Sequence, residues 1–176
     1  MQIQDMKIVR DWHVMACVAE KAHIKSAAQA ERMNKLLGIP ATILSAVVGS
    51  AVFASLGDPS KSPGWATVLV GGLGIIAAGL TGLQTFLRYA ERAENHRKFF
   101  GRYGMIRRQL EELLATYTNA HPCEDTKLHP IEREMNEVDA AAPSLSQHLY
   151  DRLAREIHAE EARRGPETSA SRRMAR

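Results

Sequence analysis

The sequence predicts an all-α fold built around a transmembrane helical hairpin that continues into long cytoplasmic helices, followed by two shorter C-terminal helices. Two stretches, 36–56 and 65–87, predict the hairpin because neither contains Asp, Glu, Lys, Arg or His. As helices they would span roughly 31 and 34 Å, close to the ~30 Å hydrocarbon core of a bilayer. The connecting segment 57–64 is rich in Gly and Pro and is typical of a turn.

The alternative is a soluble helical bundle that buries the same hairpin, and the mean hydropathy of -0.26 for the whole chain is not that of a polytopic transporter. A soluble core helix usually has one polar face, and neither stretch has one. We therefore predict that 36–56 and 65–87 insert into a membrane.

The basic residues beside the two stretches predict their orientation. Four precede the first stretch and seven follow the second, whereas the turn carries only Lys61. Because Lys and Arg in short flanking segments favour the cytoplasm, both termini should be cytoplasmic and the turn 57–64 extracytoplasmic. The first 30 residues lack an apolar segment, so we expect no cleavable signal peptide. The net charge of +3 favours contact with anionic lipid over nucleic acid, although an ordinary topology signal explains it more simply.

Small residues recur at four-residue spacing in both spans, a pattern that lets helix backbones approach closely in lipid. They are Ala41, Ser45 and Gly49 in the first span and Gly74, Ala78 and Gly82 in the second. They either pack the hairpin alone or also leave a stripe for contacts between copies, and any pore needs several copies because two spans cannot enclose one. Gln84 either lines such a pore or hydrogen-bonds to a neighbouring helix, and its place near the cytoplasmic end favours the hydrogen bond.

Long helices are expected on both sides of the hairpin, at 3–35 and 88–118. No Pro or clear stop lies between 65 and 118, so the second span should continue into the following helix without a break. Apolar and aromatic residues there form a 3–4 repeat, as in a coiled coil or bundle helix. This seam is the candidate contact surface of an oligomer, and it comprises His96, Phe99, Tyr103, Ile106, Leu110, Leu113 and Tyr117. The helix at 3–35 could lie antiparallel against the helix at 88–118, because the hairpin brings both to the same membrane surface.

The rest of the chain predicts local features around its Pro residues. The run 38–40, which ends in Pro40, should kink or restart the helix at the entry to the first span. Residues 128–162 should form two helices, with Pro130 in the first turn of one of them. The polar segment 163–176 is expected to be disordered.

Two paired segments carry a resemblance to a known family. The runs 34–40 and 48–56 resemble the first-span signature of SLATT domains, and 81–87 followed by 88–97 is similar to their second signature. The resemblance makes 1–162 a SLATT-like domain. It implies a bacterial membrane effector with two transmembrane helices and cytoplasmic helices. Family members are proposed to permeabilise the inner membrane in nucleotide-signalled anti-phage systems that kill or arrest the infected cell. No nucleotide-sensing or nucleotide-synthesising domain is recognisable here, so the resemblance implies that the signal arrives either through a nucleotide-sensing or nucleotide-synthesising partner protein or at a cytoplasmic surface of this chain.

Catalytic and ligand-binding patterns are weak. The segment 72–77 matches G-x-G-x-x-A, but no β-rich segment follows to complete a dinucleotide-binding fold. His13 and Cys17 lie one helical turn apart, which is too few ligands for a metal site. We therefore expect no enzyme activity, cofactor or metal. The sequence favours an oligomeric pore-forming effector, with a non-conducting membrane anchor that presents a helical docking surface as the alternative.

Overall fold

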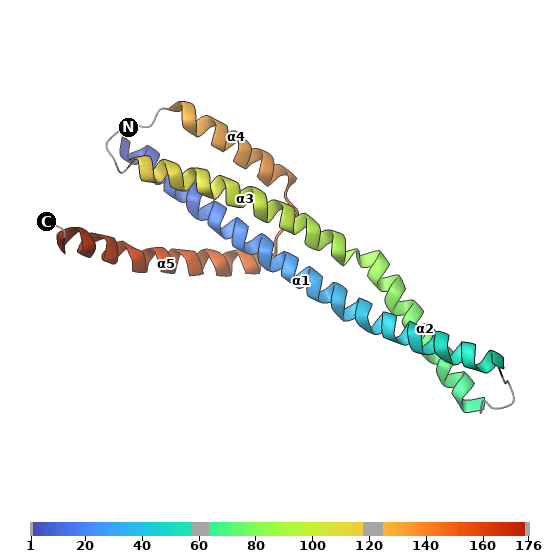
Figure 1. Cartoon of the computed structure of the whole chain (residues 1–176). Coiled ribbons are helices and arrows are strands. Elements are labelled where there is room, and N and C mark those ends of the chain that lie inside the picture. The colour runs from blue at the N-terminus through green and yellow to red at the C-terminus, as the bar shows by residue number, and fades with distance from the viewer. Residues whose placement is uncertain (1, 58–63, 118–124, 175–176) are drawn as a thin grey trace. The chain divides into compact units, whose positions relative to one another are not determined.

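The computed structural model describes residues 2–57, 64–117 and 125–174, and within these ranges it is entirely helical apart from short connections. The helices are α1 (Gln2–Gly57), α2 (Gly64–Leu87), α3 (Tyr89–Tyr117), α4 (Asp125–Ala141) and α5 (Gln147–Met174), as Figure 1 shows. The prediction of an all-α fold is therefore confirmed. The segments 58–63 and 118–124 lie outside the described residues, and with them most of the predicted turn.

The helices form two compact units, each with its own contacts. Residues 28–93 make up the hairpin unit, which contains the end of α1, all of α2 and the first residues of α3. Residues 1–27 and 94–176 make up the bundle unit, which contains the start of α1, most of α3, and α4 and α5.

The bundle unit has an apolar core on two faces of α1. On one face, Val9, Ala16 and Ala19 pack with side chains of α3 and α4. On the other face, Val14, Val18 and Ala22 pack with Leu153 and Ile157 of α5. Small residues on α1 allow close approach from both sides, because Ala adds little width to a helix. The unit therefore has a core that requires no contribution from the hairpin.

The start of α1 and α3 run antiparallel within the bundle unit. His13 contacts Glu111 and Glu20 contacts Arg107, whereas His23, further along α1, contacts His96, which lies earlier on α3. The antiparallel pair that the sequence allowed is thus present.

Three helix boundaries differ from the prediction. Helix α1 runs through Pro40 without a break, because one missing N–H leaves the rest of the helical hydrogen bonds in place. Helix α4 begins at Asp125, so Pro130 lies inside it and beyond the first turn. Helix α5 extends to Met174 and so includes 163–174, for which the sequence predicts disorder.

The fourth difference lies at Arg88, between the second span and the following helix. Arg88 has a φ of 48°, in the left-handed region, and this residue separates α2 from α3. The expected uninterrupted helix is therefore wrong at this one residue. The Arg88 N–H still donates to the Gln84 carbonyl at 3.2 Å, and the Arg92 N–H donates to the Arg88 carbonyl at 3.1 Å. Neither Gly nor Asn marks the position, so the sequence gives no local signal for it.

Candidate functional site

The hairpin unit directs apolar side chains outward. The most apolar 18-residue windows of its two long helices have mean hydropathies of 2.0 and 1.9, yet only 6% of each window is buried. Phe53, Val68, Ile75 and Phe86 are each at least 76% exposed. A core helix of a soluble bundle would bury such residues against its neighbours. Both helices are long and apolar enough to cross a membrane, and a membrane location explains why their side chains have no protein cover.

The structure divides the predicted small residues into two groups. Ala41 is buried, and a Cβ at Gly74 would lie in ordinary contact with Val48, 3.7 Å from its Cγ1 atom, so these two positions pack the hairpin. The other four are exposed, and they are Ser45, Gly49, Ala78 and Gly82. A Cβ added at Gly49 or Gly82 would meet nothing within 4 Å. The hairpin therefore leaves narrow, uncovered strips on both helices.

Gln84 connects the two helices at one end of the hairpin. Its Nε2 atom donates a hydrogen bond to Asn34 Oδ1 at 3.1 Å. Gly38 provides the space, since a Cβ there would lie 2.9 Å from Gln84 Nε2. Gln84 thus bonds to the neighbouring helix, the alternative that its position favours. No sequence pattern marks Asn34, because its role depends on a residue 50 positions away.

Hydroxyl side chains of the hairpin bond to their own helices. Thr42 donates to the Gly38 carbonyl, Ser50 to that of Ala46, and Thr81 to that of Ala77, at 2.8, 2.8 and 2.9 Å. Each bond reaches back one turn, as Ser and Thr commonly do within helices. These groups are therefore satisfied without water, which suits a helix in lipid.

The predicted oligomer seam is occupied within one copy. Phe99, Tyr103, Ile106 and Leu110 are buried in the core of the bundle unit with Val9, Ala16 and Ala19 of α1 and with Ile131, Met135 and Val138 of α4. Leu113 packs against the same cluster, and the side chain of Tyr117 lies outside the described residues. This face of α3 is thus covered by α1 and α4 within one copy, and a role of the seam in contacts between copies stays a prediction. A 3–4 repeat identifies a buried face, but it does not identify what buries that face.

Neither a protein-family model, nor a curated protein, nor a solved structure matches this chain. The resemblance to SLATT domains accordingly stays a prediction, and the site must be interpreted from its own geometry.

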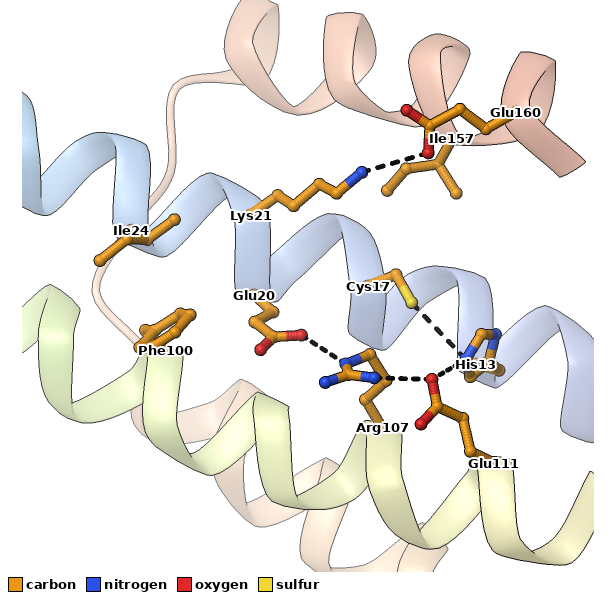
Figure 2. A pocket seen from close by; sticks show the side chains of 10 residues that line it. All are labelled: His13, Cys17, Glu20, Lys21, Ile24, Phe100, Arg107, Glu111, Ile157 and Glu160. Atoms are coloured by element: carbon orange, nitrogen blue, oxygen red, sulfur yellow. Dashed lines mark hydrogen bonds and ion pairs between the residues drawn. The ribbon is translucent and has the colours of Figure 1, made fainter.

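A cavity of about 410 Å³, lined by both charged and apolar side chains, lies in the bundle unit between α1, α3 and α5 (Figure 2). Arg107 lies at its centre, where Nε donates to Glu20 Oε2 at 2.7 Å and Nη1 to Glu111 Oε1 at 2.6 Å. At the α5 side, Lys21 pairs with Glu160 at 3.4 Å. Opposite charges lie beside each other throughout, so the cavity has no strong preference for an anion or a cation.

Cys17 and His13 line the same cavity without the geometry of a catalytic pair. His13 Nε2 faces both Cys17 Sγ at 3.7 Å and Glu111 Oε1 at 3.3 Å (Figure 2). In nucleophile–His–acid triads the two neighbours use different ring nitrogens. Burial also raises the pKa of the Cys17 thiol to about 11, which disfavours the reactive thiolate. Among the described residues, no group of three His, Cys, Asp or Glu side chains is placed to hold a metal ion.

A histidine pair lies inside the bundle unit. His23 Nδ1 and His96 Nδ1 are 2.9 Å apart, and the His23 ring stacks on Tyr103 at a centroid distance of 5.4 Å. His23 is fully buried, and its Nε2 has no hydrogen-bond partner among the described residues. Burial, and then the neighbouring His96, lower the pKa of His23 to about 4, so the pair is neutral at pH 7. The sequence places each histidine on an apolar face but does not show that they meet.

Proposed function

We propose that this chain is an oligomeric effector that permeabilises the bacterial inner membrane in a nucleotide-signalled defence system. The observation that supports the proposal most is the hairpin unit, whose apolar side chains and small-residue strips are exposed in a single copy. The apolar side chains suit a bilayer, and the strips suit close contact with the helices of further copies. Several copies together could enclose a path that two spans cannot.

The distribution of charge supports an orientation with both termini in the cytoplasm. Arg32, Lys35, Arg88 and Arg92 all lie in the hairpin unit, just outside its apolar stretches, and all are exposed. Basic residues at this position favour the cytoplasmic side of a membrane. A nucleotide-sensing or nucleotide-synthesising partner would then act on the bundle unit.

Dye release from liposomes tests the proposal. The full chain, purified in detergent and reconstituted into liposomes, should form an oligomer by mass and release an entrapped dye, either directly or when the triggering partner is added. An oligomer that never conducts under any trigger would contradict the pore.

Substituting the exposed glycines gives a sharper prediction. Gly49→Leu and Gly82→Leu should leave the hairpin folded, because a Cβ at either position meets nothing within 4 Å. Leu at these positions should still hold neighbouring copies apart, so the rate of dye release and the oligomer mass should both fall. Val47→Leu, at an exposed position outside the strips, is the matched control and should behave as the wild type. Unchanged release from both glycine variants would remove the strips from the assembly.

The alternative function is a membrane anchor. It is favoured by one observation, the core that the bundle unit forms without the hairpin. If the hairpin only tethers this unit, replacing 36–56 and 65–87 by an unrelated transmembrane hairpin should preserve protection against phage in cells. Under the effector proposal the same exchange should abolish protection.

A further inference from the structure

We propose that Arg88 is a switch point at which the chain alternates between a broken and a continuous α2–α3 helix. In the broken conformation, which is the one described above, Gln84 stays hydrogen-bonded to Asn34. In the continuous conformation α2 turns about its own axis and presents Ala78 and Gly82 to α1 instead. The inference concerns the conformations of a single copy, so it does not depend on whether the chain conducts.

The sequence around Arg88 favours the continuous helix. Residues 83–94 contain no Gly, Pro or Asn, and Arg is itself among the better helix formers. Arg88 nevertheless has a φ of 48°, which is unfavourable for Arg because the Cβ crowds the following carbonyl oxygen. A conflict between local preference and observed backbone is expected at functional positions. Contacts elsewhere in the chain must therefore hold the break in place.

The contacts that α2 and α3 make with α1 explain the break. Within the hairpin unit, Gln84 of α2 donates to Asn34 of α1 at 3.1 Å. Within the bundle unit, His96 of α3 lies 2.9 Å from His23 of α1, measured between the Nδ1 atoms. His23 and Asn34 are 11 residues apart in one unbroken helix, so they lie only about 20° apart around it. Helix α1 thus uses a single face for both neighbours.

A straight α2–α3 helix could not supply both partners on one face. Gln84 and His96 are 12 residues apart, so on a continuous helix they would lie about 120° apart. The change of face begins within the hairpin unit, because Ala93 is only 5% exposed although it would lie about 180° from Gln84 on a straight helix. Arg88 lies between Gln84 and Ala93, where this change occurs. An ordinary helical φ at Arg88 must therefore release one of the two contacts.

The contact made by α2 is the weaker of the two. Ala77 is the one buried residue of α2, and Gln84 contributes a single hydrogen bond to α1. Helix α3 instead buries four large side chains in the core of the bundle unit, and these are Phe99, Tyr103, Ile106 and Leu110. Because burial of several large apolar side chains outweighs one hydrogen bond, α2 should turn while α3 keeps its place in the bundle unit.

The turned α2 would present a face that suits close packing. On a straight α2–α3 helix, Ala78 lies 18 residues before His96, which is about five full turns, so the two share a face. Gly82 lies 14 residues before His96 and within about 40° of it. Both small residues are exposed in the broken conformation, and a Cβ at Gly82 would meet nothing within 4 Å. Small residues let helix backbones approach closely, so this second face can also pack on α1.

The switch would then control assembly, a consequence that rests on the proposed function. In the broken conformation Ala78 and Gly82 are exposed and open to the helices of further copies. In the continuous conformation α1 covers them within one copy. The continuous helix is therefore the form that stays unassembled, and the helix broken at Arg88 is the form that assembles.

Disulfide trapping in the hairpin distinguishes the two conformations. Helices α1 and α2 run antiparallel, Ala41 lies seven residues after Asn34, and Ala77 lies seven residues before Gln84. The two buried alanines are therefore level with each other. Ala41→Cys with Ala77→Cys should cross-link in the broken conformation, and Ala41→Cys with Ala78→Cys in the continuous one.

The measurement is the ratio of the two cross-linking rates. The full chain, with Cys17 and Cys123 replaced by Ser, would be reconstituted into liposomes and oxidised, and each cross-link followed by mass spectrometry. Arg88→Gly should raise the ratio of the 41–77 to the 41–78 cross-link about fivefold, because Gly adopts a left-handed backbone readily. Arg88→Ile should lower the ratio below that of the wild type, because a β-branched residue is least compatible with a positive φ. Arg88→Lys, which keeps the charge and a similar backbone preference, is the matched control and should keep the wild-type ratio.

Two outcomes would overturn the switch. One is an equal ratio in Arg88→Gly, Arg88→Ile and the wild type, and the other is a 41–78 cross-link that forms in no variant. Oligomer mass tests the control of assembly, since the chain locked by the 41–78 cross-link should form smaller assemblies than the chain locked by 41–77. Failure of the proposed function gives a different result, because a ratio that follows residue 88 in a chain that never releases dye keeps the switch and loses the pore.

Discussion

Replacing Leu110 by Asp should abolish the cooperative unfolding of the bundle unit. Leu110 is fully buried in the cluster that joins α1, α3 and α4. The substitution removes a buried side chain and puts a carboxylate among apolar neighbours, which together cost about 5 kcal/mol or more. Natural domains are stable by only about 5–15 kcal/mol. Circular dichroism during heating of the full chain in detergent should therefore show the transition lost or strongly shifted to lower temperature.

The control for this substitution lies on the same helix. Met105 is 47% exposed, so Met105→Asp should change the free energy of unfolding by less than about 1 kcal/mol. If Leu110→Asp instead melts like the wild type while the oligomer mass falls, the seam serves contacts between copies and its placement inside one copy is wrong.

Acid should weaken the bundle unit through His23. The pKa of His23 lies near 4 in the folded chain and near its ordinary 6.5 in the unfolded chain, because burial disfavours the charged ring. Between these values the unfolded state binds more protons, so stability is complete above about pH 6.5 and is lost as the pH falls toward 4. The loss should be on the order of 3 kcal/mol for this group. Burial also lowers the pKa of His96, which acts in the same direction.

The geometry of the His23–His96 pair explains why protonation of either ring is unfavourable. In the neutral pair, His23 Nδ1–H can donate to His96 Nδ1. His23 Nε2, which has no partner among the described residues, then carries a lone pair and no hydrogen that needs an acceptor. If His96 takes a proton and becomes the donor, the hydrogen of His23 must move to Nε2, where a buried N–H has no acceptor among the described residues. An unpaired buried donor is costly, so each protonated form is less stable than the neutral one.

Urea unfolding of the full chain in detergent between pH 7.5 and 4.5 measures this effect. The wild-type midpoint should fall with pH, and His23→Phe should flatten the fall, because Phe keeps a ring against Phe99 and Tyr103 and has no titrating nitrogen. A wild-type midpoint that does not change from pH 7 to 5, or an equal slope in His23→Phe, would show that the pair does not control acid stability.

The sequence predicted what depends on local composition. The two spans follow from uncharged runs whose length the bilayer thickness dictates, and the antiparallel contact of α1 with α3 follows because a short turn must return the chain. The residues that cover the α3 seam could not be predicted. They include Ile131, Met135 and Val138 of α4, and no local pattern links them to α3.

Interactions that depend on a single residue, or on two residues far apart in the chain, could not be predicted from the sequence either. The pairs His23–His96 and Asn34–Gln84 are separated by 73 and 50 residues, and neither partner has a pattern that selects the other. The left-handed Arg88 has the same sequence context as a helical arginine. The sequence pattern nevertheless selected seven small and polar residues in the spans that the structure divides into two groups. Some face the neighbouring helix and the others do not.

The hydroxyl bonds of the spans have a consequence for motion. Because Thr42, Ser50 and Thr81 bond to carbonyls of their own helices, these bonds survive when one span turns about its long axis or slides along the other. The bond between Gln84 and Asn34 does not survive such a movement, since it joins the two helices at a single point near one end. The two spans are thus joined near one end by this hydrogen bond and at the other end covalently through the segment 57–64, so breaking the bond would free the Asn34 end while the other end stays connected.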